Sequence, residues 1–469
     1  MQHSPAYVEV ADYLNHLERF DVKPGLERIR ALMERFGQPQ LKYPVVLVGG
    51  TNGKGSTVEF IAGILRCAGY KVGVYTSPHI YRFNERIRIV TSGSSRRAGE
   101  LFDGEIADDD LLRLLNTVRP VAEDLARTTD LRGATTFEIL TAMGFLYFAE
   151  QQVDLAVVEV GLGGRWDATN LTEPIVSVIT NVSLDHTDRL GDTVEKIARE
   201  KMEIARPGRV LVTGETDPKL LQVFREFCAE RGAALLLPEA EFHVDSYRFD
   251  CGIPYFAAMS LKIGGYQREI TGDQEAARQG LFAAFQERNL SLAISAVIHL
   301  KRSGWKIERQ YLERACASAA IPGRFEFLSG DSFPLIIADA ANNPAGMEAL
   351  RSAFIRFRDW ALADREAPFK FLNLVLVLGI SADKAVEEMV SIIAPLARTV
   401  IATQADNRRA APAERIAEAA RKHCAEVRVA VPVREAVRQA LDLAEPNDLV
   451  LITGSFFVLG EIDREELTG

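Results

Sequence analysis

A glycine-rich turn that directly follows an apolar stretch is the feature that most constrains the fold of this chain. The run Val45-Val-Leu-Val-Gly-Gly-Thr-Asn-Gly-Lys-Gly-Ser-Thr57 joins four aliphatic residues to four glycines, a lysine and two terminal hydroxyl residues. Such a turn points backbone N–H groups at a phosphate, the lysine adds positive charge, and a hydroxyl can ligate Mg²⁺. An ordinary strand-to-helix turn requires neither the lysine nor four glycines. We therefore expect a phosphate loop made of Gly50, Thr51, Asn52, Gly53, Lys54, Gly55, Ser56 and Thr57.

The spelling of this loop departs from the common P-loop at two positions. Val48 stands where the first glycine of that motif belongs, and Gly55 follows the lysine where Ser or Thr is usual. The loop is therefore a variant form.

Apolar runs of strand length alternate with helical patterns over the first 220 residues. The strand-like runs are 45–48, 72–75, 155–160, 175–180 and 209–213, and a helix is expected from Ser56 onward. This alternation predicts an α/β fold with a doubly wound, mainly parallel sheet. Residues 240–280 change in character and predict antiparallel strands, followed by a helix near 287–300.

Pro322 and Gly323 interrupt a helical pattern before a second series of strands begins. We expect a P-loop domain over residues 1–320 and a smaller, Rossmann-like α/β domain over residues 321–469. Strands of the second domain are expected at 334–339, 372–378, 399–403, 426–429 and 448–453. This domain has no glycine-rich loop of its own, so we expect it to complete the nucleotide site and to bind a second substrate.

Charge and hydropathy argue against several partners. The chain carries 55 Lys and Arg against 65 Asp and Glu, a net charge of −10, and has no dense basic run, so we expect no nucleic-acid partner. Its apolar runs are of strand length and its N-terminus lacks a signal-peptide core, which predicts a cytoplasmic protein without a membrane span. A monomer is the default expectation.

Two potential metal ligands follow predicted strands. Glu159 comes after the apolar run 155–158, and His186 lies shortly after the run 175–180. An open parallel sheet presents its active site at these strand ends, and a carboxylate there can complete a magnesium shell. A lone glutamate or histidine is more often solvated or structural. The P-loop motif is what favours their interpretation as metal ligands.

Further motifs occur along nearly the whole chain, and their order is more specific than any one of them. One of them is Glu159-Val-Gly-Leu-Gly-Gly-Arg-Trp-Asp-Ala-Thr-Asn170. The others are residues 20–28, 50–57, 75–79, 83–86, 136–138, 199–201, 322–325 and 379–384. With these motifs the chain resembles the folylpolyglutamate synthases, including the bifunctional dihydrofolate synthase form, of the Mur ligase superfamily of ATP-dependent ligases.

The resemblance implies roles for the cations and for the metal ligands. Lys54 would neutralise the phosphates of ATP, and Lys201 would become carbamylated, which turns an ammonium into an anion. Without the resemblance, Lys201 would be interpreted as a solvated surface lysine beside Glu200 and Glu203. The implied Mg²⁺ ligands, for two expected sites, are Ser77, Glu159 and His186.

The resemblance also implies the remaining binding residues. A guanidinium suits the carboxylate of an incoming glutamate, although Arg86 could instead form a surface ion pair with Glu85. The implied nucleotide contacts beyond the loop are Asn289, Arg324 and Asp339, and the implied glutamate or folate contacts are Arg86, Thr136, Glu138, Asn342 and Ser455. The implied catalytic set is Lys54, Arg86, His186, Lys201 and Asn342.

Asn342 is the main departure from the family pattern. The family motif Asp-x-Ala-His-Asn-Pro is Asp339-Ala-Ala-Asn-Asn-Pro344 here, so an asparagine stands where the histidine belongs. Asparagine keeps hydrogen-bonding capacity but carries no proton-borne charge near neutral pH. A milder departure is Phe457, where some members have histidine. Either the histidine mainly orients a partner, or glutamate handling is altered in this chain.

The implied reaction is the ATP-dependent addition of L-glutamate to a folate or to dihydropteroate. Phosphoryl transfer to the acid gives an acyl phosphate, which the amino group of glutamate attacks. Two alternatives remain open: a related ligase acting on a cell-wall precursor or another acidic peptide, and a nucleotide-binding homologue without catalysis. The lead-in at residues 13–40 argues against the first because it leaves no room for a separate UDP-binding domain. Dihydrofolate synthesis and polyglutamate extension are not distinguished.

Overall fold

The computed structural model describes residues 3–17, 25–131, 133–238, 240–250, 253–263, 266–270, 284–318, 321–328, 334–363 and 373–468. The chain forms two compact units: Met1–Ala240 with Asn289–Cys316, and Glu241–Arg288 with Ala317–Gly469. The predicted boundary at residue 320 lies close to the last change of unit. Residues 241–288, which we expected in the first domain, group with the second unit.

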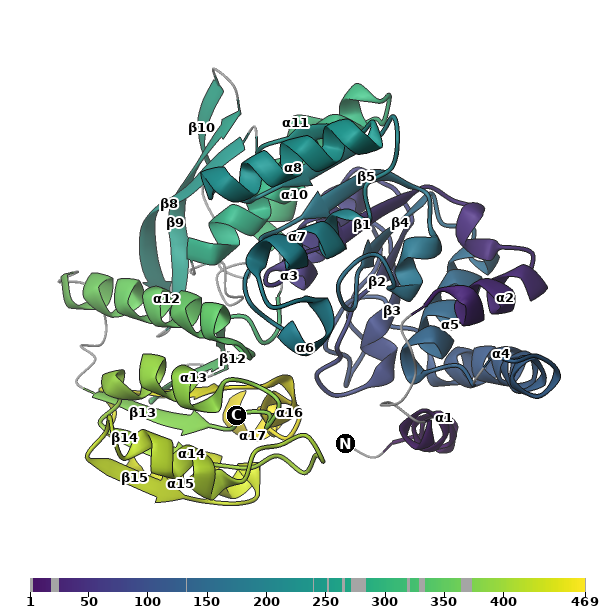
Figure 1. The fold of residues 1–469 in the computed structure, drawn as a ribbon. Coiled ribbons are helices and arrows are strands. Elements are labelled where there is room, and N and C mark those ends of the chain that lie inside the picture. The colour runs from purple at the N-terminus through teal and green to yellow at the C-terminus, as the bar shows by residue number, and fades with distance from the viewer. Residues whose placement is uncertain are drawn as a thin grey trace. The chain divides into compact units, whose positions relative to one another are not determined.

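A seven-stranded sheet forms the centre of the first unit, with helices packed on both of its faces (Figure 1). In spatial order its strands are β3 (Ile87–Val90), β2 (Val72–Tyr75), β4 (Leu155–Glu159), β1 (Val45–Gly49), β5 (Pro174–Ile179), β6 (Val210–Thr213) and β7 (Ala234–Leu236). Every neighbouring pair is parallel except β2 and β3. Strands β1 and β4 are buried along their whole length, as expected for aliphatic strands covered on both sides. The predicted doubly wound, mainly parallel sheet is confirmed.

The first of the two predicted helices, after the phosphate loop, begins at Lys54, two residues earlier than expected, and the second, near 287–300, is also present. Both belong to the helices that the structure describes up to residue 318. These helices are α1 (Pro5–His16), α2 (Glu27–Arg35), α3 (Lys54–Cys67), α4 (Asp108–Thr128), α5 (Thr136–Glu150), α6 (Thr187–Leu190), α7 (Val194–Met202), α8 (Pro218–Arg231), α10 (Ala284–Arg302) and α11 (Arg309–Ser318), with 3-10 turns η1 (Pro39–Leu41), η2 (Phe83–Arg86) and η3 (Ala168–Leu171).

The sequence pattern does not predict the edge strand β3, because Arg88 interrupts its short apolar run. The Arg88 side chain is buried, where it pairs with Glu59 and lies over the Phe102 ring at 4.5 Å. An ion pair and an aromatic face together compensate the burial of a guanidinium, so an arginine is compatible with this strand.

The antiparallel strands predicted between residues 240 and 280 are confirmed. Strands β8 (Ala240–Asp250), β9 (Ile253–Ile263) and β10 (Tyr266–Ile270) form a three-stranded sheet in which β9 lies in the middle. The pairing of β9 with β10 is antiparallel, with Ile263 opposite Tyr266.

A six-stranded sheet forms the core of the second unit, and the prediction of a second α/β domain is confirmed. Its strands, in spatial order, are β11 (Glu326–Phe327), β12 (Leu335–Asp339), β16 (Asp448–Thr453), β13 (Asn373–Leu378), β14 (Thr399–Ala402) and β15 (Glu426–Val429). All pairs are parallel except β11 with β12. Its helices are α12 (Pro344–Ala363), α13 (Val386–Ile393), α14 (Ala413–Ala420), α15 (Val433–Leu443), α16 (Phe456–Leu459) and α17 (Arg464–Thr468), with the 3-10 turn η4 (Ala394–Leu396).

Strand register determines which loops meet. In the first unit Val48 pairs with Glu159 and Gly49 pairs with Ile179, so the phosphate loop and the loops after β4 and β5 leave the same edge. Among the described residues, no helix is both long enough and apolar enough to cross a membrane.

Candidate active site

The phosphate loop depends on two glycines in the left-handed region of backbone space. Gly50 has φ 137° and Gly53 has φ 83°. A Cβ atom on Gly50 would overlap the Thr180 hydroxyl, and one on Gly53 would overlap the Asn289 side-chain amide. Both positions therefore require glycine, for the backbone angle and for the close approach of a neighbour. Asn289, a predicted nucleotide contact, is thereby placed directly against the loop.

The segment that follows β5 holds the loop in place. Asn181 accepts from the backbone N–H of Thr51 at 2.9 Å and, through its side chain, from that of Asn52 at 3.1 Å. The Asn52 carbonyl in turn accepts from the Thr180 hydroxyl at 2.6 Å and from the Asn181 amide at 2.9 Å. These contacts fix the backbone before the first turn of α3. Our sequence interpretation missed Thr180 and Asn181 as partners of the loop; their polar character at the end of a predicted strand is the signal that could have identified them.

The start of α3 offers groups that suit a phosphate and a divalent cation. The first N–H groups of a helix lack intrahelical acceptors and favour an anion. Ser56 is 1% exposed, and its hydroxyl has no hydrogen-bond partner among the residues that the structure describes. A buried polar group of this kind usually has a partner. Ser56 therefore fits a ligand oxygen or a metal ion at this position.

Glu159 and Ser77 lie beside the same helix start. A Cβ atom on Gly55 would lie 3.6 Å from Glu159 Oε2, and this oxygen accepts from the backbone N–H of Ser77 at 2.9 Å. The structure thus brings two of the three predicted metal ligands together, at the phosphate loop.

His186 is the third predicted metal ligand. It precedes α6 with φ 50°, and its Nε2 lies 3.8 Å from Oδ1 of the adjacent Asp185. Among the described residues, no group of three or more His, Cys, Asp or Glu side chains is arranged to hold a metal ion. A role for His186 stays a prediction, whereas the hard oxygen donors of Ser56, Ser77 and Glu159 suit Mg²⁺.

Lys201 is buried, so its interpretation as a solvated surface lysine is wrong. Its residue is 4% exposed, and its Nζ donates to the Gly50 carbonyl at 2.9 Å. Burial, and secondly the positive charge of Lys54, lower the pKa of Lys201 from 10.5 to about 7. Near neutral pH this amine is therefore often unprotonated, with a lone pair that can react.

The Lys54 side chain folds back onto the phosphate loop. Its Nζ donates to the Thr51 carbonyl at 3.1 Å, so its charge lies over the loop. Two lysines thus act on each other beside the phosphate loop, an arrangement that a polyphosphate would neutralise.

Arg86 lies at the end of η2, on the loop between β2 and β3. Its Nε donates to His79 Nδ1 at 2.9 Å. The Glu85 carboxylate instead accepts from the backbone N–H groups of Ile80, Tyr81 and Arg82. Burial raises the pKa of the Glu85 carboxyl, whereas these backbone N–H groups and the charge of Arg86 lower it, so Glu85 holds the turn and also interacts with Arg86.

Thr136 and Glu138, the predicted acceptor-site residues, have structural contacts at the start of α5. Glu138 forms a reciprocal capping box with Thr135 and a 3.0 Å ion pair with Arg28, and Thr136 donates to the Leu14 carbonyl at 2.8 Å. The spacing Thr-x-x-Glu is itself the sequence signal for such a cap. Their contact with a folate stays a prediction.

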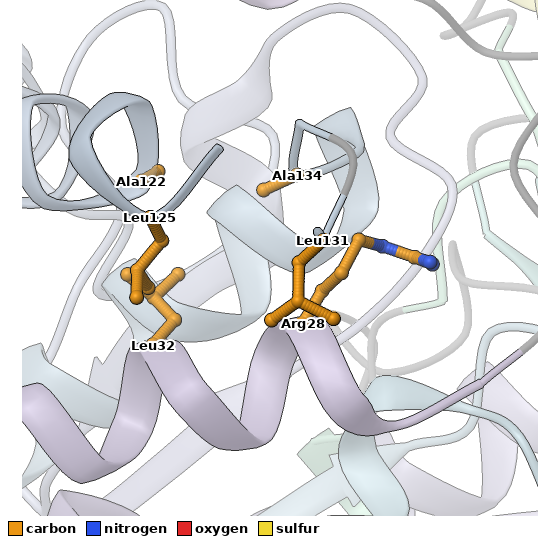
Figure 2. Close-up of a pocket in the computed structure, with 6 residues that line it drawn as sticks. All are labelled: Arg28, Leu32, Ala122, Leu125, Leu131 and Ala134. Atoms are coloured by element: carbon orange, nitrogen blue, oxygen red, sulfur yellow. The ribbon is translucent and has the colours of Figure 1, made fainter. Parts of the chain in front are cut away.

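A small pocket lies near this cap, between α2, α4 and the connection from α4 to α5. Figure 2 shows that the Arg28 guanidinium points away from the leucines of the pocket. This orientation agrees with the ion pair between Arg28 and Glu138. The other described residues that line the pocket are apolar. The lining residues are Arg28, Leu32, Ala122, Leu125, Leu131 and Ala134.

Three predicted residues of the second unit, Asp339, Asn342 and Ser455, lie at or just after two adjacent strand ends, where Asp339 pairs in register with Thr453. The fourth, Arg324, precedes β11. The buried Asp339 carboxylate accepts from the backbone N–H groups of Phe325 and Ala341, each at 2.8 Å. Burial raises its pKa to about 6, against the lowering effect of Arg324. The Arg324 guanidinium lies 4.7 Å from the centre of the Phe456 ring.

Ser455 and Asn342 belong to the same edge of the second sheet. The Ser455 hydroxyl caps α16 by accepting from the Val458 N–H at 3.2 Å. Asn342 is half-buried, and its neighbour Asn343 caps α12 through a 2.8 Å bond from the Gly346 N–H. Ligand contacts of Arg324, Asp339, Asn342 and Ser455 stay predictions.

Comparison with known proteins identifies relatives over the full length. Residues 116–234 match the Mur ligase middle domain, and residues 323–456 match the Mur ligase glutamate ligase domain. The chain is 34% identical over 466 residues to a dihydrofolate synthase/folylpolyglutamate synthase of Bacillus subtilis, covering 98% of this chain and 99% of the relative. The structure resembles that of Mycobacterium tuberculosis folylpolyglutamate synthase complexed with ADP, with TM-score 0.80, 31% identity and 97% of each chain covered.

A second solved structure of similar fold contains a metal ion. It is the bifunctional folylpolyglutamate synthase/dihydrofolate synthase of Yersinia pestis complexed with AMPPNP and a Mn ion. The TM-score is 0.74 at 27% identity, with 98% of each chain covered.

The buried amine of Lys201 generates a pH prediction. Between about pH 7 and its ordinary value of 10.5, Lys201 binds fewer protons in the folded than in the unfolded chain, so its contribution makes folding stability rise with pH. In CO₂-free buffer, Lys201→Met should flatten this rise by at most ~1.4 kcal/mol per pH unit. Denaturant unfolding of both proteins between pH 6.5 and 9 measures it; parallel profiles would contradict the assigned pKa.

Proposed function

Because the chain belongs to the dihydrofolate synthase/folylpolyglutamate synthase family of Mur ligases, we propose that it joins L-glutamate to a folate-type carboxylic acid, with cleavage of ATP to ADP and phosphate. The observation that carries this proposal is the start of α3. There the buried Ser56 hydroxyl, Lys54 and the Glu159 carboxylate lie at a loop in which Gly50 and Gly53 must be glycine. A cytoplasmic location, a monomeric state and the absence of a nucleic-acid partner stay predictions.

The first chemical step is phosphoryl transfer. A carboxylate oxygen of the folate-type acid attacks the γ-phosphorus of ATP, the bond to the bridging oxygen breaks, and ADP leaves. Lys54 and the N–H groups at the start of α3 stabilise the phosphate charge in place. Ser56, Ser77 and Glu159 would hold Mg²⁺, which supplies further positive charge to the phosphates when it is bound.

The second step is attack of the glutamate amine on the acyl phosphate. The nitrogen forms the amide bond through a tetrahedral intermediate, phosphate leaves, and the amine releases its proton. Arg86 is proposed to hold a carboxylate of the incoming glutamate, since a guanidinium offers paired hydrogen bonds to a carboxylate. Its defined orientation toward His79 supports a binding role.

Lys201 is proposed to be carbamylated. Its neutral amine attacks the carbon of CO₂, a nitrogen–carbon bond forms, and a proton is released, which leaves an anionic carbamate. The lowered pKa and burial support this proposal, because CO₂ reacts with the unprotonated amine and the product replaces repulsion of Lys54 by attraction. Lys201 Nζ donates to the carbonyl oxygen of Gly50 in the phosphate loop, so the carbamate would lie at the nucleotide site.

An activity assay tests the reaction. Purified protein with ATP, Mg²⁺ and L-glutamate should release ADP on addition of dihydropteroate, a reduced folate, or both, and should not respond to a UDP-muramyl substrate. Lys54→Met should lower kcat/KM by about a hundredfold or more, because the charge over the phosphates is lost. Lys42→Met, at an exposed lysine outside the loop, is the matched control. No turnover with either pterin substrate would overturn the proposed reaction.

The carbamate can be observed directly. With ¹³C-bicarbonate, wild-type protein should give a carbamate carbon signal that Lys201→Met lacks, and the signal should strengthen as pH rises through about 7, as the amine loses its proton. Carbon NMR under both conditions measures this. A carbamate signal of equal size in both proteins would assign the modification to another amine.

Asn342 provides a test of glutamate handling. Asn342→His should lower the KM for glutamate by about fivefold and leave that for ATP unchanged, because an imidazole can carry positive charge toward a carboxylate. Steady-state kinetics with each substrate varied in turn measure the two constants, and Asn342→Ala separates gain of histidine from loss of asparagine. Equal effects on both constants, or none, would count against a glutamate-side role.

A further inference from the structure

His79 contacts the proposed glutamate-binding arginine directly. Arg86 Nε donates to His79 Nδ1 at 2.9 Å. Phe83 lies against both side chains: its ring centre is 4.5 Å from that of His79, at 66°, and 5.9 Å from the Arg86 guanidinium carbon. The three side chains therefore form one cluster, which we call the Arg86 cluster.

Glu85 brings the members of the Arg86 cluster together. Its buried carboxylate accepts from three successive backbone N–H groups, those of Ile80 at 2.6 Å and of Tyr81 and Arg82 at 2.7 Å. This closes a turn that returns the chain from His79 to Arg86. The base of the loop is closed by the Thr76 N–H, which donates to the Arg86 carbonyl at 3.1 Å.

Contacts with two other segments keep this loop in place. Asn84 donates to the Ile106 carbonyl at 2.7 Å and to Asp108 at 2.8 Å, and Asp108 also pairs with Arg82. The Phe83 N–H donates to the Tyr7 hydroxyl of α1 at 3.4 Å. Hydrogen bonds and an ion pair to neighbouring segments therefore hold the loop that carries the Arg86 cluster, as a preorganised binding group requires.

The hydrogen bond determines the state of the imidazole. A guanidinium only donates, so His79 Nδ1 must provide a lone pair and the ring proton must be on Nε2. Using Nε for this bond sets the plane of the guanidinium while the terminal nitrogens keep the fork geometry that carboxylates match. Residue 79 must therefore provide a hydrogen-bond acceptor at the position of Nδ1 to bind Arg86 Nε.

We propose that His79 is a positioning residue, which orients the Arg86 guanidinium for the carboxylate of the incoming glutamate. This proposal rests on the glutamate-binding role proposed for Arg86. Fixing the guanidinium before binding removes part of the ordering cost of the complex, so the effect should be seen in glutamate affinity.

Two substitutions separate the hydrogen bond from the packing. His79→Phe keeps an aromatic ring against Phe83 but removes the acceptor, and should raise the KM for glutamate about tenfold, as expected for a lost bond to a charged group. The KM for ATP, kcat at saturating glutamate and the unfolding midpoint should stay near wild type. His79→Asn keeps an oxygen near the position of Nδ1 and should recover most of the affinity, whereas His79→Gln, with its polar atoms near Nε2, should not.

The positioning role of His79 and the proposed reaction can fail independently of each other. Wild-type turnover tests the reaction, and the ratio of His79→Phe to wild type tests the positioning role. An unchanged glutamate KM in His79→Phe, an equal rise in the ATP KM, or no recovery in His79→Asn would overturn it. Proton exchange of the Arg86 Nε–H, followed by ¹⁵N NMR, needs no turnover: it should be slower in wild type and His79→Asn than in His79→Phe, and equal rates in all three would also overturn the proposal.

Discussion

The close approach of side chains to Gly50 and Gly53 is the constraint on which the nucleotide site of the first unit depends. Thr180 and Asn289 occupy the space where Cβ atoms would lie, and Asn181 binds the intervening backbone. The loop therefore has one conformation set from outside, by the segment after β5 and by α10. Its N–H groups are oriented before any phosphate arrives, which is how a site stabilises charge without reorganising.

The charges of two lysines also shape the nucleotide site. Lys201 and Lys54 act on each other beside the same loop, and the pKa of Lys201 falls because its charge is both buried and repelled. Positive charge on both lysines is therefore unfavourable, and a bound polyphosphate would relieve the repulsion. In the second unit, the buried Asp339 uses its carboxylate to tie the backbone of Phe325 to the end of β12, and this defines the segment that carries Arg324.

Much of the fold and part of the site could be predicted from the sequence. The aliphatic runs of β1, β4 and β5 identify strands buried on both faces, and the glycines and Lys54 identify the loop between β1 and α3. Strand β3 could not be predicted, since Arg88 is accommodated only by Glu59 and Phe102. The partners of Glu138, a helix cap and Arg28, became apparent only in the structure, and its contact with a folate stays a prediction.

The sequence by itself determined most of the buried strands, the phosphate loop and the family, because these depend on local spacing of apolar residues, glycines and short motifs. Only the tertiary structure decided which polar side chains are buried and what they contact. Lys201 donates to the Gly50 carbonyl, and Arg86 donates to His79. Burial and pairing of this kind depend on segments far apart in the chain, and desolvation then changes the pKa and reactivity of a group that looks ordinary in sequence.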